Sequence, residues 1–305
     1  MTTGVLVMAY GGPDSLEDVA PYLLDVRGRR ETPDTIVHEV RERYAKIGGR
    51  SPILERTWAQ ASALDVLLNA NGRRFVVSVG MRHWHPYIRD AVRDLRNRGV
   101  TRIVGVVMAP HYSRMSVGAY YEVLAEAANG LPVRGIEHWH LLPGYVATLV
   151  EHVRDALARF PEDVRDRVPV IYTAHSLPER IRTSGDPYPT QLLQTVEAVA
   201  AALGPHPHAF AYQSAAMTKE PWLGPDAGEV LDGLARAGAP GVVIAPIGFV
   251  CEHVEILYDV DVELRSRAEA LGLRLERIRM VNDAPATMAG LADLIREAAE
   301  TAGWT

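Results

Sequence analysis

GVVIAPIGFVCEHVEILYDVD, residues 241–261, decides the fold expected for this region of the chain. Its first part, 241–245, is apolar without alternation, which is typical of a strand buried on both faces of a sheet. A second segment, IYTAHSLPER (171–180), has the same design, because an apolar strand ends abruptly at His175. Imidazole binds metal ions and carries protons. Functional groups at the ends of buried strands are therefore the pattern to explain.

Acidic side chains follow the strand of the first segment in a helical stretch predicted over 252–271. Glu255, Asp259 and Glu263 are spaced by four residues, so they fall on one helical face. Glu255 stands among apolar neighbours, and a carboxylate there is costly unless it is paired or binds a cation. Glu252 is explained by its place at the start of the helix, where negative charge is favourable. The row of acids predicts a site for a cation.

Continuous apolar runs recur along the chain with helical stretches between them. Strands are predicted over 4–9, 75–80, 102–109, 133–139, 168–174, 209–213, 241–246 and 274–280, and helices over 86–98, 146–159, 191–203, 226–237 and 252–271. This alternation favours an α/β fold with parallel sheets.

Four strands followed by four predict two Rossmann-like domains, each a four-stranded parallel sheet flanked by helices. We expect domain 1 over residues 1–145 and domain 2 over 146–284. A C-terminal helix over 285–303 is a candidate to pack on domain 1. In open α/β sheets, ligands bind outside the carboxyl ends of the strands. Polar and aromatic residues follow most of the predicted strands, which places the expected active-site cleft between the two domains.

Composition bounds the class of protein. The chain has 305 residues, 48% of them hydrophobic and 23% charged, which matches a soluble globular protein. The net charge of −6 disfavours nucleic acid as the main partner. No apolar run reaches the roughly 20 residues that cross a bilayer. Cys251 is the single cysteine, so the chain alone forms no disulfide and no all-cysteine cluster. We expect a cytoplasmic protein without a membrane span.

Several of these residues have simpler interpretations. His175 also fits a satisfied core histidine, and Ser176 lacks the G-x-S-x-G elbow of a hydrolase nucleophile. Cys251 fits a buried, inert thiol. Arginines are frequent in the first fifty residues, where they either bind ligand carboxylates through paired hydrogen bonds or lie on a solvated surface. The Gly11-Gly12 turn lacks both common phosphate-loop signatures.

Long ordered motifs together resemble the ferrochelatase family, which inserts Fe²⁺ into a porphyrin. They cover essentially the whole chain: VLVMAYGGP (5–13), RYAKIGGRSP (43–52), APHYSRMSVGAYY (109–121), AHSLPERIRTSGDPYPTQL (174–192), AYQSAAMTKEPWLGPD (211–226) and PIGFVCEHVEILYDVD (246–261). Within the family, Tyr10 stands where the soluble bacterial branch that acts on coproporphyrin III has a tyrosine.

The resemblance implies a role for individual residues. His175 and Glu255 are implied as the central catalytic and iron-binding pair, and Tyr10 as the group facing the metal from the opposite, axial side. Asp259 and Glu263 are implied as a relay for protons or metal. The residues implied to contact the macrocycle or its propionates are Arg27, Arg43, Tyr44, Ser51 and Tyr120.

The resemblance also implies the partners. Porphyrin and ferrous iron are substrates, no prosthetic group is required, and no iron–sulfur cluster is expected. A monomer is expected, with a transient partner for handing over the product. Insertion of iron into coproporphyrin III is the function favoured by the motifs. Protoporphyrin IX as substrate, a cobalt or nickel chelatase of related fold, and a non-catalytic haem carrier are the alternatives that the sequence leaves open.

Overall fold

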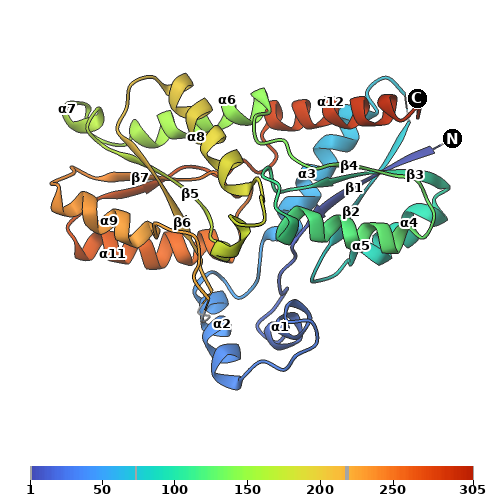
Figure 1. The fold of residues 1–305 in the computed structure, drawn as a ribbon, viewed down its shortest axis with the longest axis horizontal. Coiled ribbons are helices and arrows are strands. Elements are labelled where there is room, and N and C mark those ends of the chain that lie inside the picture. The colour runs from blue at the N-terminus through green and yellow to red at the C-terminus, as the bar shows by residue number, and fades with distance from the viewer. Residues whose placement is uncertain (1, 73, 217–219, 305) are drawn as a thin grey trace.

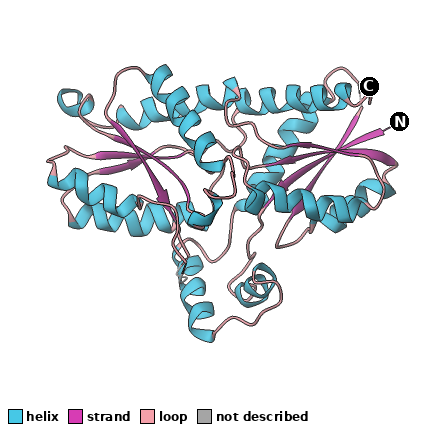
Figure 2. Cartoon of the chain, in the orientation of Figure 1, coloured by secondary structure: helices cyan, strands magenta, loops and turns pink. Residues whose placement is uncertain are grey.

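A computed structural model describes residues 2–72, 74–216 and 220–304. The described chain contains two four-stranded parallel sheets, with strand orders β2-β1-β3-β4 and β6-β5-β7-β8. Figure 2 shows the two sheets side by side, each between layers of helices. The strands are β1 (Thr2–Ala9), β2 (Phe75–Met81), β3 (Val100–Val107), β4 (Val133–Ile136), β5 (Val170–His175), β6 (His208–Gln213), β7 (Val242–Pro246) and β8 (Leu275–Arg277). The expected fold class is confirmed.

The helices complete the strand–helix alternation. They are α1 (Val19–Val26), α2 (Asp34–Lys46), α3 (Ile53–Leu68), α4 (Ile88–Asn97), α5 (Ala119–Ala128), α6 (Pro143–Leu157), α7 (Glu162–Arg165), α8 (Tyr188–Leu203), α9 (Ala227–Arg236), α10 (Val254–Leu257), α11 (Arg265–Ala270) and α12 (Pro285–Thr301). Short π-helical segments η1 (Arg114–Gly118) and η3 (Asp259–Leu264) and a 3₁₀ turn η2 (Glu179–Ile181) lie between them. No helix of the described residues is long and apolar enough to span a membrane.

Each sheet is covered on both faces, which explains why its strands are apolar without alternation. In the first half, α4 and α5 form one apolar cluster with one face of the sheet, whereas α3 and α12 pack on the other face. In the second half, α9 and α11 cover one face, and α6 and α8 cover the other. Figure 1 shows α6, α8 and α12 along one edge of the molecule and α1 and α2 projecting from the opposite edge.

Helix α12 joins the two halves. It packs against α3 and β4 of the first half and also against α6. The crossing of α6 and α12 requires glycine at position 144, because a Cβ there would lie 2.1 Å from the carbonyl oxygen of Ala286. One continuous apolar cluster therefore runs from the first sheet through α12 and α6 to the second sheet. This shared core fixes the two sheets relative to each other, so that the carboxyl ends of their strands face a common space.

The acidic segment is not one regular α-helix. It begins at Val254 and changes at Asp259 into the π-helical segment η3, where the amide of Glu263 donates to the carbonyl of Tyr258 at 2.9 Å. Four residues slightly exceed one turn of an α-helix but fall short of a turn closed by i→i+5 bonds. The step from Glu255 to Asp259 therefore rotates slightly more than one full turn, and the step from Asp259 to Glu263 slightly less. These two rotations offset each other, so the three carboxylates stay on one side of the segment.

Candidate active site

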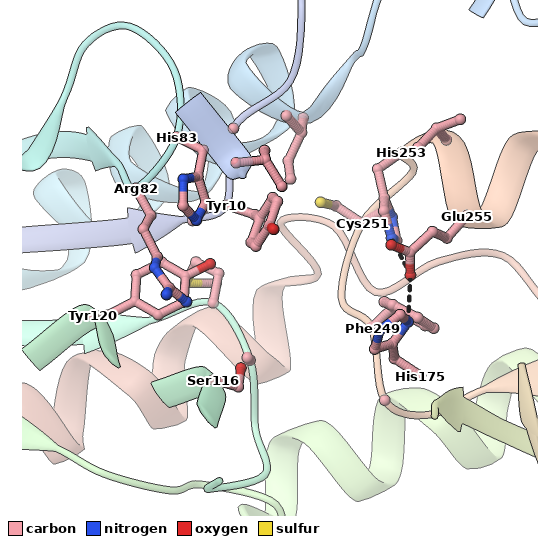
Figure 3. Close-up of a pocket in the computed structure, with 18 of the residues that line it drawn as sticks. Tyr10, Arg82, His83, Ser116, Tyr120, His175, Phe249, Cys251, His253 and Glu255 are labelled. Carbon is pink, nitrogen blue, oxygen red and sulfur yellow. Dashed lines mark hydrogen bonds and ion pairs between the residues drawn. The ribbon is translucent and has the colours of Figure 1, made fainter. Parts of the chain in front are cut away.

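A cavity of about 510 Å³ lies between the carboxyl ends of the two sheets. Its volume falls within the roughly 300–1,000 Å³ of typical ligand pockets. The segments that follow β1, β2 and β3 line it from the first half, and those that follow β5 and β7 line it from the second. Figure 3 shows the two walls, with Tyr10, Arg82, His83 and Tyr120 on one and His175, Glu255 and His253 on the other. The cleft expected between the two sheets is present.

His175 and Glu255 form the centre of the second wall. His175 Nδ1 lies 3.0 Å from Glu255 Oε2, and the two side chains keep 33% and 31% of their surface exposed to the cavity. Burial lowers the pKa of His175, but the Glu255 carboxylate outweighs it and raises the pKa above its usual value. Burial opposes ionisation of Glu255, yet His175 and His253 hold its pKa well below the usual range. Each group of the pair therefore favours the charged form of the other.

The backbone around this pair is held by hydrogen bonds between distant segments. Tyr188 donates its hydroxyl to the carbonyl of His175 at 3.0 Å. Gln213, at the end of β6, donates to the carbonyl of Glu255 at 2.9 Å and accepts from the Thr173 hydroxyl at 2.7 Å. A buried amide satisfied on both sides fixes the segments that it connects. Gln213 thus couples the strand that carries His175 to the helix that carries Glu255.

The acidic row continues from the cavity wall towards solvent. Asp259 accepts a hydrogen bond from Ser214 and lies 3.8 Å from an Arg43 guanidinium nitrogen. Burial raises the pKa of Asp259, and the neighbouring carboxylates of Glu255 and Glu263 raise it further, although the Ser214 hydrogen bond opposes them. Glu263 is exposed. The three carboxylates therefore run from a partly exposed ion pair to the surface, but only Glu255 lines the cavity.

Tyr10 occupies the opposite wall, as expected from the turn that follows β1. Its ring packs against the ring of His83, with centroids 4.6 Å apart. Burial raises the pKa of Tyr10 to about 12, although the Arg82 guanidinium opposes this shift. Tyr10 is therefore a neutral phenol near neutral pH. Arg82 also lies over the Tyr120 ring, 5.5 Å from its centroid, so the wall combines a cation with two phenols.

The other predicted porphyrin contacts divide into two groups. Tyr44, Ser51 and Tyr120 line the cavity and are buried. Arg27 and Arg43 lie outside its lining. Arg27 ends α1 directly after the lining residue Val26, and its Nε is a buried donor without a hydrogen-bond partner within the described residues. Arg43 contacts Asp259 and lies over the Tyr258 ring at 5.2 Å, so it bridges α2 and the acidic segment.

Sequence reasoning missed several groups. Arg82 carried no motif signal, although it follows β2 beside His83. His253 Nε2 lies 3.8 Å from Glu255, which makes it a second imidazole on the same carboxylate. The prediction that Glu252 starts a helix is wrong, because the helix begins at Val254. Glu252 instead pairs with Arg56 of α3 at 3.1 Å. The thiol of Cys251 is buried, and burial raises its pKa to about 12, as expected for an inert cysteine.

No set of three or more His, Cys, Asp or Glu side chains within 2–72, 74–216 and 220–304 is arranged as a metal site. The His175–Glu255 pair offers one nitrogen and carboxylate oxygens on one side of the cavity. Part of the motif at 211–226 falls on residues 217–219, which lie outside the described structure.

The fold is that of the two-domain α/β chelatases. It is similar to the sirohydrochlorin chelatase SirB from Bacillus subtilis subspecies spizizenii in complex with cobalt, with a TM-score of 0.55 and 12% identity over 99% of this chain and 97% of that one. The sequence model of the ferrochelatase family matches residues 2–299. The chain belongs to the ferrochelatase family, as the motifs predicted.

Two relatives illustrate the match. The chain is 42% identical to a ferrochelatase of Deinococcus radiodurans over 306 residues, covering 98% of this chain and 97% of that one. It is 39% identical to the coproporphyrin III ferrochelatase of Geobacillus kaustophilus over 300 residues, covering 96% and 95%. Insertion of iron into a porphyrin is therefore the activity of this chain at the level of the family.

Proposed function

We propose that the protein inserts Fe²⁺ into coproporphyrin III and releases iron coproporphyrin III. The observation that carries the proposal is the cavity with the His175–Glu255 ion pair on one wall and Tyr10 on the other. A flat apolar macrocycle between the walls has its centre within reach of both. Similarity over nearly the full length to relatives named coproporphyrin III ferrochelatases supports the choice of porphyrin. Iron is a substrate here, and the proposal requires no prosthetic group.

Metallation removes two protons from the pyrrole nitrogens and strips water from the incoming ion. A carboxylate and an imidazole each accept a proton or bind a cation. We assign both tasks to His175 and Glu255 together, acting on one face of the ring. The Glu255 carboxylate, whose pKa lies well below the usual range, supplies the negative charge that attracts Fe²⁺. Asp259 and Glu263 extend this charge to the surface, which suits a route for iron inwards or protons outwards.

The rim of the cavity suits the carboxylates of the substrate. Arg27 presents a buried donor without a partner within the described chain, and a buried donor of this kind favours a ligand acceptor. We propose that Arg27 and Arg43 bind propionates. Ser51 forms a hydrogen bond with the macrocycle or a propionate, and the rings of Tyr44 and Tyr120 contact the macrocycle. Arg43 already lies beside Asp259, so a bound propionate would share the guanidinium with this carboxylate.

Porphyrin preference is the first test. We expect the kcat/KM of anaerobic Fe²⁺ insertion to be at least about tenfold higher with coproporphyrin III than with protoporphyrin IX, because two further charge-assisted hydrogen bonds each contribute about 1.5–3 kcal/mol. Absorbance spectroscopy follows the metallation. Equal values for both porphyrins would contradict the proposed substrate. Stoichiometric binding without turnover of either would identify a carrier, and turnover with Co²⁺ or Ni²⁺ alone would identify a different chelatase.

Tyr10 gives the second test. Replacing Tyr10 by phenylalanine removes the hydroxyl but keeps the ring against His83, so folding is expected to be retained. If Tyr10 faces the iron, the absorption spectrum of the bound iron product will differ between wild type and variant, because the group opposite the metal changes. Thermal unfolding of both proteins is the control. An unchanged spectrum would remove Tyr10 from the surroundings of the metal.

A further inference from the structure

The wall that carries Tyr10 contains a carboxylate–imidazole pair. Asp25 Oδ2 lies 3.0 Å from His83 Nδ1, at hydrogen-bonding distance. The exposed fractions of the two side chains are 13% for His83 and 18% for Asp25, so both are largely shielded from water. Asp25 belongs to α1, and His83 follows β2, 58 positions further along the chain. The contact therefore joins two separate parts of the same cavity wall.

His83 is tied to Tyr10 by backbone and by ring contact. The amide of His83 donates to the carbonyl of Tyr10 at 2.9 Å, and the preceding amide of Arg82 donates to the carbonyl of Ala9 at 2.9 Å. The rings of Tyr10 and His83 are 4.6 Å apart with an interplanar angle of 53°. His83 lies directly beside Tyr10 in Figure 3. Any rotation of the imidazole thus changes the surface on which the Tyr10 ring rests.

A carboxylate that contacts Nδ1 determines the tautomer and the orientation of a histidine ring. It accepts the Nδ1–H, so the neutral ring keeps its proton there and Nε2 keeps its lone pair. It also fixes the orientation of the ring plane, because the χ2 angle of histidine otherwise has a broad distribution. Carboxylates that orient histidines in this way in metal sites commonly change activity by about 10–100-fold when they are replaced. Asp25 is well placed for this effect, since its contact with Arg29 is longer, at 3.8 Å.

We propose that Asp25 is a positioning residue for iron insertion, which holds the His83 ring against Tyr10 and thereby fixes the angle at which Tyr10 faces the centre of the macrocycle. The inference rests on the proposed function, in which Tyr10 lies on the axial side of the iron. It adds a second element to the first wall: α1 sets the geometry of Tyr10 through His83. Asp25 itself does not line the cavity.

A purely structural role is the competing explanation, because the contact also anchors α1. The chain offers a matched control for it. Trp84, the residue after His83, donates its indole N–H to Asp14 at 2.9 Å. This contact likewise fastens the β2 exit to the segment before α1, but neither Asp14 nor Trp84 lines the cavity. Asp14→Ala therefore measures the effect of loosening the anchor without disturbing the surface under Tyr10.

The experiment compares Asp25→Ala, Asp25→Asn, His83→Phe and Asp14→Ala with wild type. For Asp25→Ala we expect kcat for iron insertion to fall about tenfold with KM for porphyrin within about twofold, since the binding groups are untouched. The spectrum of the bound iron product is expected to shift in the direction given by Tyr10→Phe. Asp25→Asn keeps a carbonyl acceptor for Nδ1–H and should restore most of the activity and the spectrum. Asp14→Ala should match wild type in both.

The His83→Phe background completes the test. If Asp25 acts through His83, adding Asp25→Ala to His83→Phe produces no further loss of kcat. Equal losses in Asp25→Ala and Asp14→Ala, or a wild-type spectrum and kcat in Asp25→Ala, would overturn the assignment. Failure of wild type to insert iron would instead contradict the proposed function, so the two failures are distinguishable. Thermal unfolding identifies a variant that fails to fold. If Asp25→Ala fails to fold, the spectrum of the product bound to Asp25→Asn alone tests the assignment.

Discussion

Replacing Glu255 by glutamine, or His175 by alanine, lowers the rate of iron insertion by about 10²–10⁴-fold, which is the usual contribution of a positioned acid–base group. Glutamine keeps the shape of Glu255 but removes the charge that attracts Fe²⁺ and the acceptor for a pyrrole proton. It also leaves His175 without its counterion at 3.0 Å, so the imidazole loses the partner that raises its pKa. Single-turnover metallation, followed by absorbance under anaerobic conditions, measures the loss.

Controls separate this chemistry from folding and from binding. Porphyrin affinity, measured by fluorescence quenching, should stay within a few-fold of wild type in both variants, because neither residue is expected to contact a propionate. Glu269→Gln is the matched carboxylate variant, since Glu269 is exposed on α11 beyond the acidic row, and it should insert iron at the wild-type rate. Near-normal iron insertion by well-folded Glu255→Gln and His175→Ala would show that the pair is not the reaction centre.

The sheets were predictable because they are covered on both faces. Each strand core is apolar without alternation, so strands β1 to β8 could be recognised from apolar runs with an error of a few residues at the ends. Helices α1 to α3, over 19–68, carried no comparable signal in the sequence analysis. Helix α2 in particular has few apolar residues and buries only Tyr44, so its face towards the cavity cannot be read from periodicity.

The site was predictable only where strand ends carry unusual residues. His175 ends an apolar strand, Tyr10 directly follows one, and Glu255 stands among apolar neighbours, so each of them is conspicuous in the sequence. Contacts between distant segments left no such signal. The pair of Asp25 and His83 and the pair of Arg56 and Glu252 each join residues far apart in the sequence. The π-helical segment after Tyr258 was likewise hidden, because its sequence has the same four-residue spacing as a regular helix.

Gly248→Ala is expected to damage both stability and catalysis, because position 248 lies against the strand that carries His175. A Cβ there would lie 2.6 Å from the Cβ of Ala174 and 2.8 Å from its Cα. The loop cannot simply move away, since the amide of Gly248 donates to the carbonyl of Thr173 at 3.1 Å. Overpacking of this kind typically costs about 1–3 kcal/mol of unfolding free energy.

The catalytic consequence of Gly248→Ala follows from its neighbours in the chain. Ala174 precedes His175, and Gly248 is followed by the segment that leads to Glu255, so relief of the overlap separates the two residues whose atoms lie 3.0 Å apart. We expect kcat to fall at least about tenfold, since displacements near 1 Å can cost about 100-fold. Gly233→Ala is the control: that glycine lies in α9 with its nearest neighbouring atom 4.0 Å from the added Cβ, so alanine should stabilise the helix by about 0.5–1 kcal/mol. Thermal unfolding and metallation rates decide, and a Gly248→Ala protein with wild-type values of both would contradict the tight packing of the two segments.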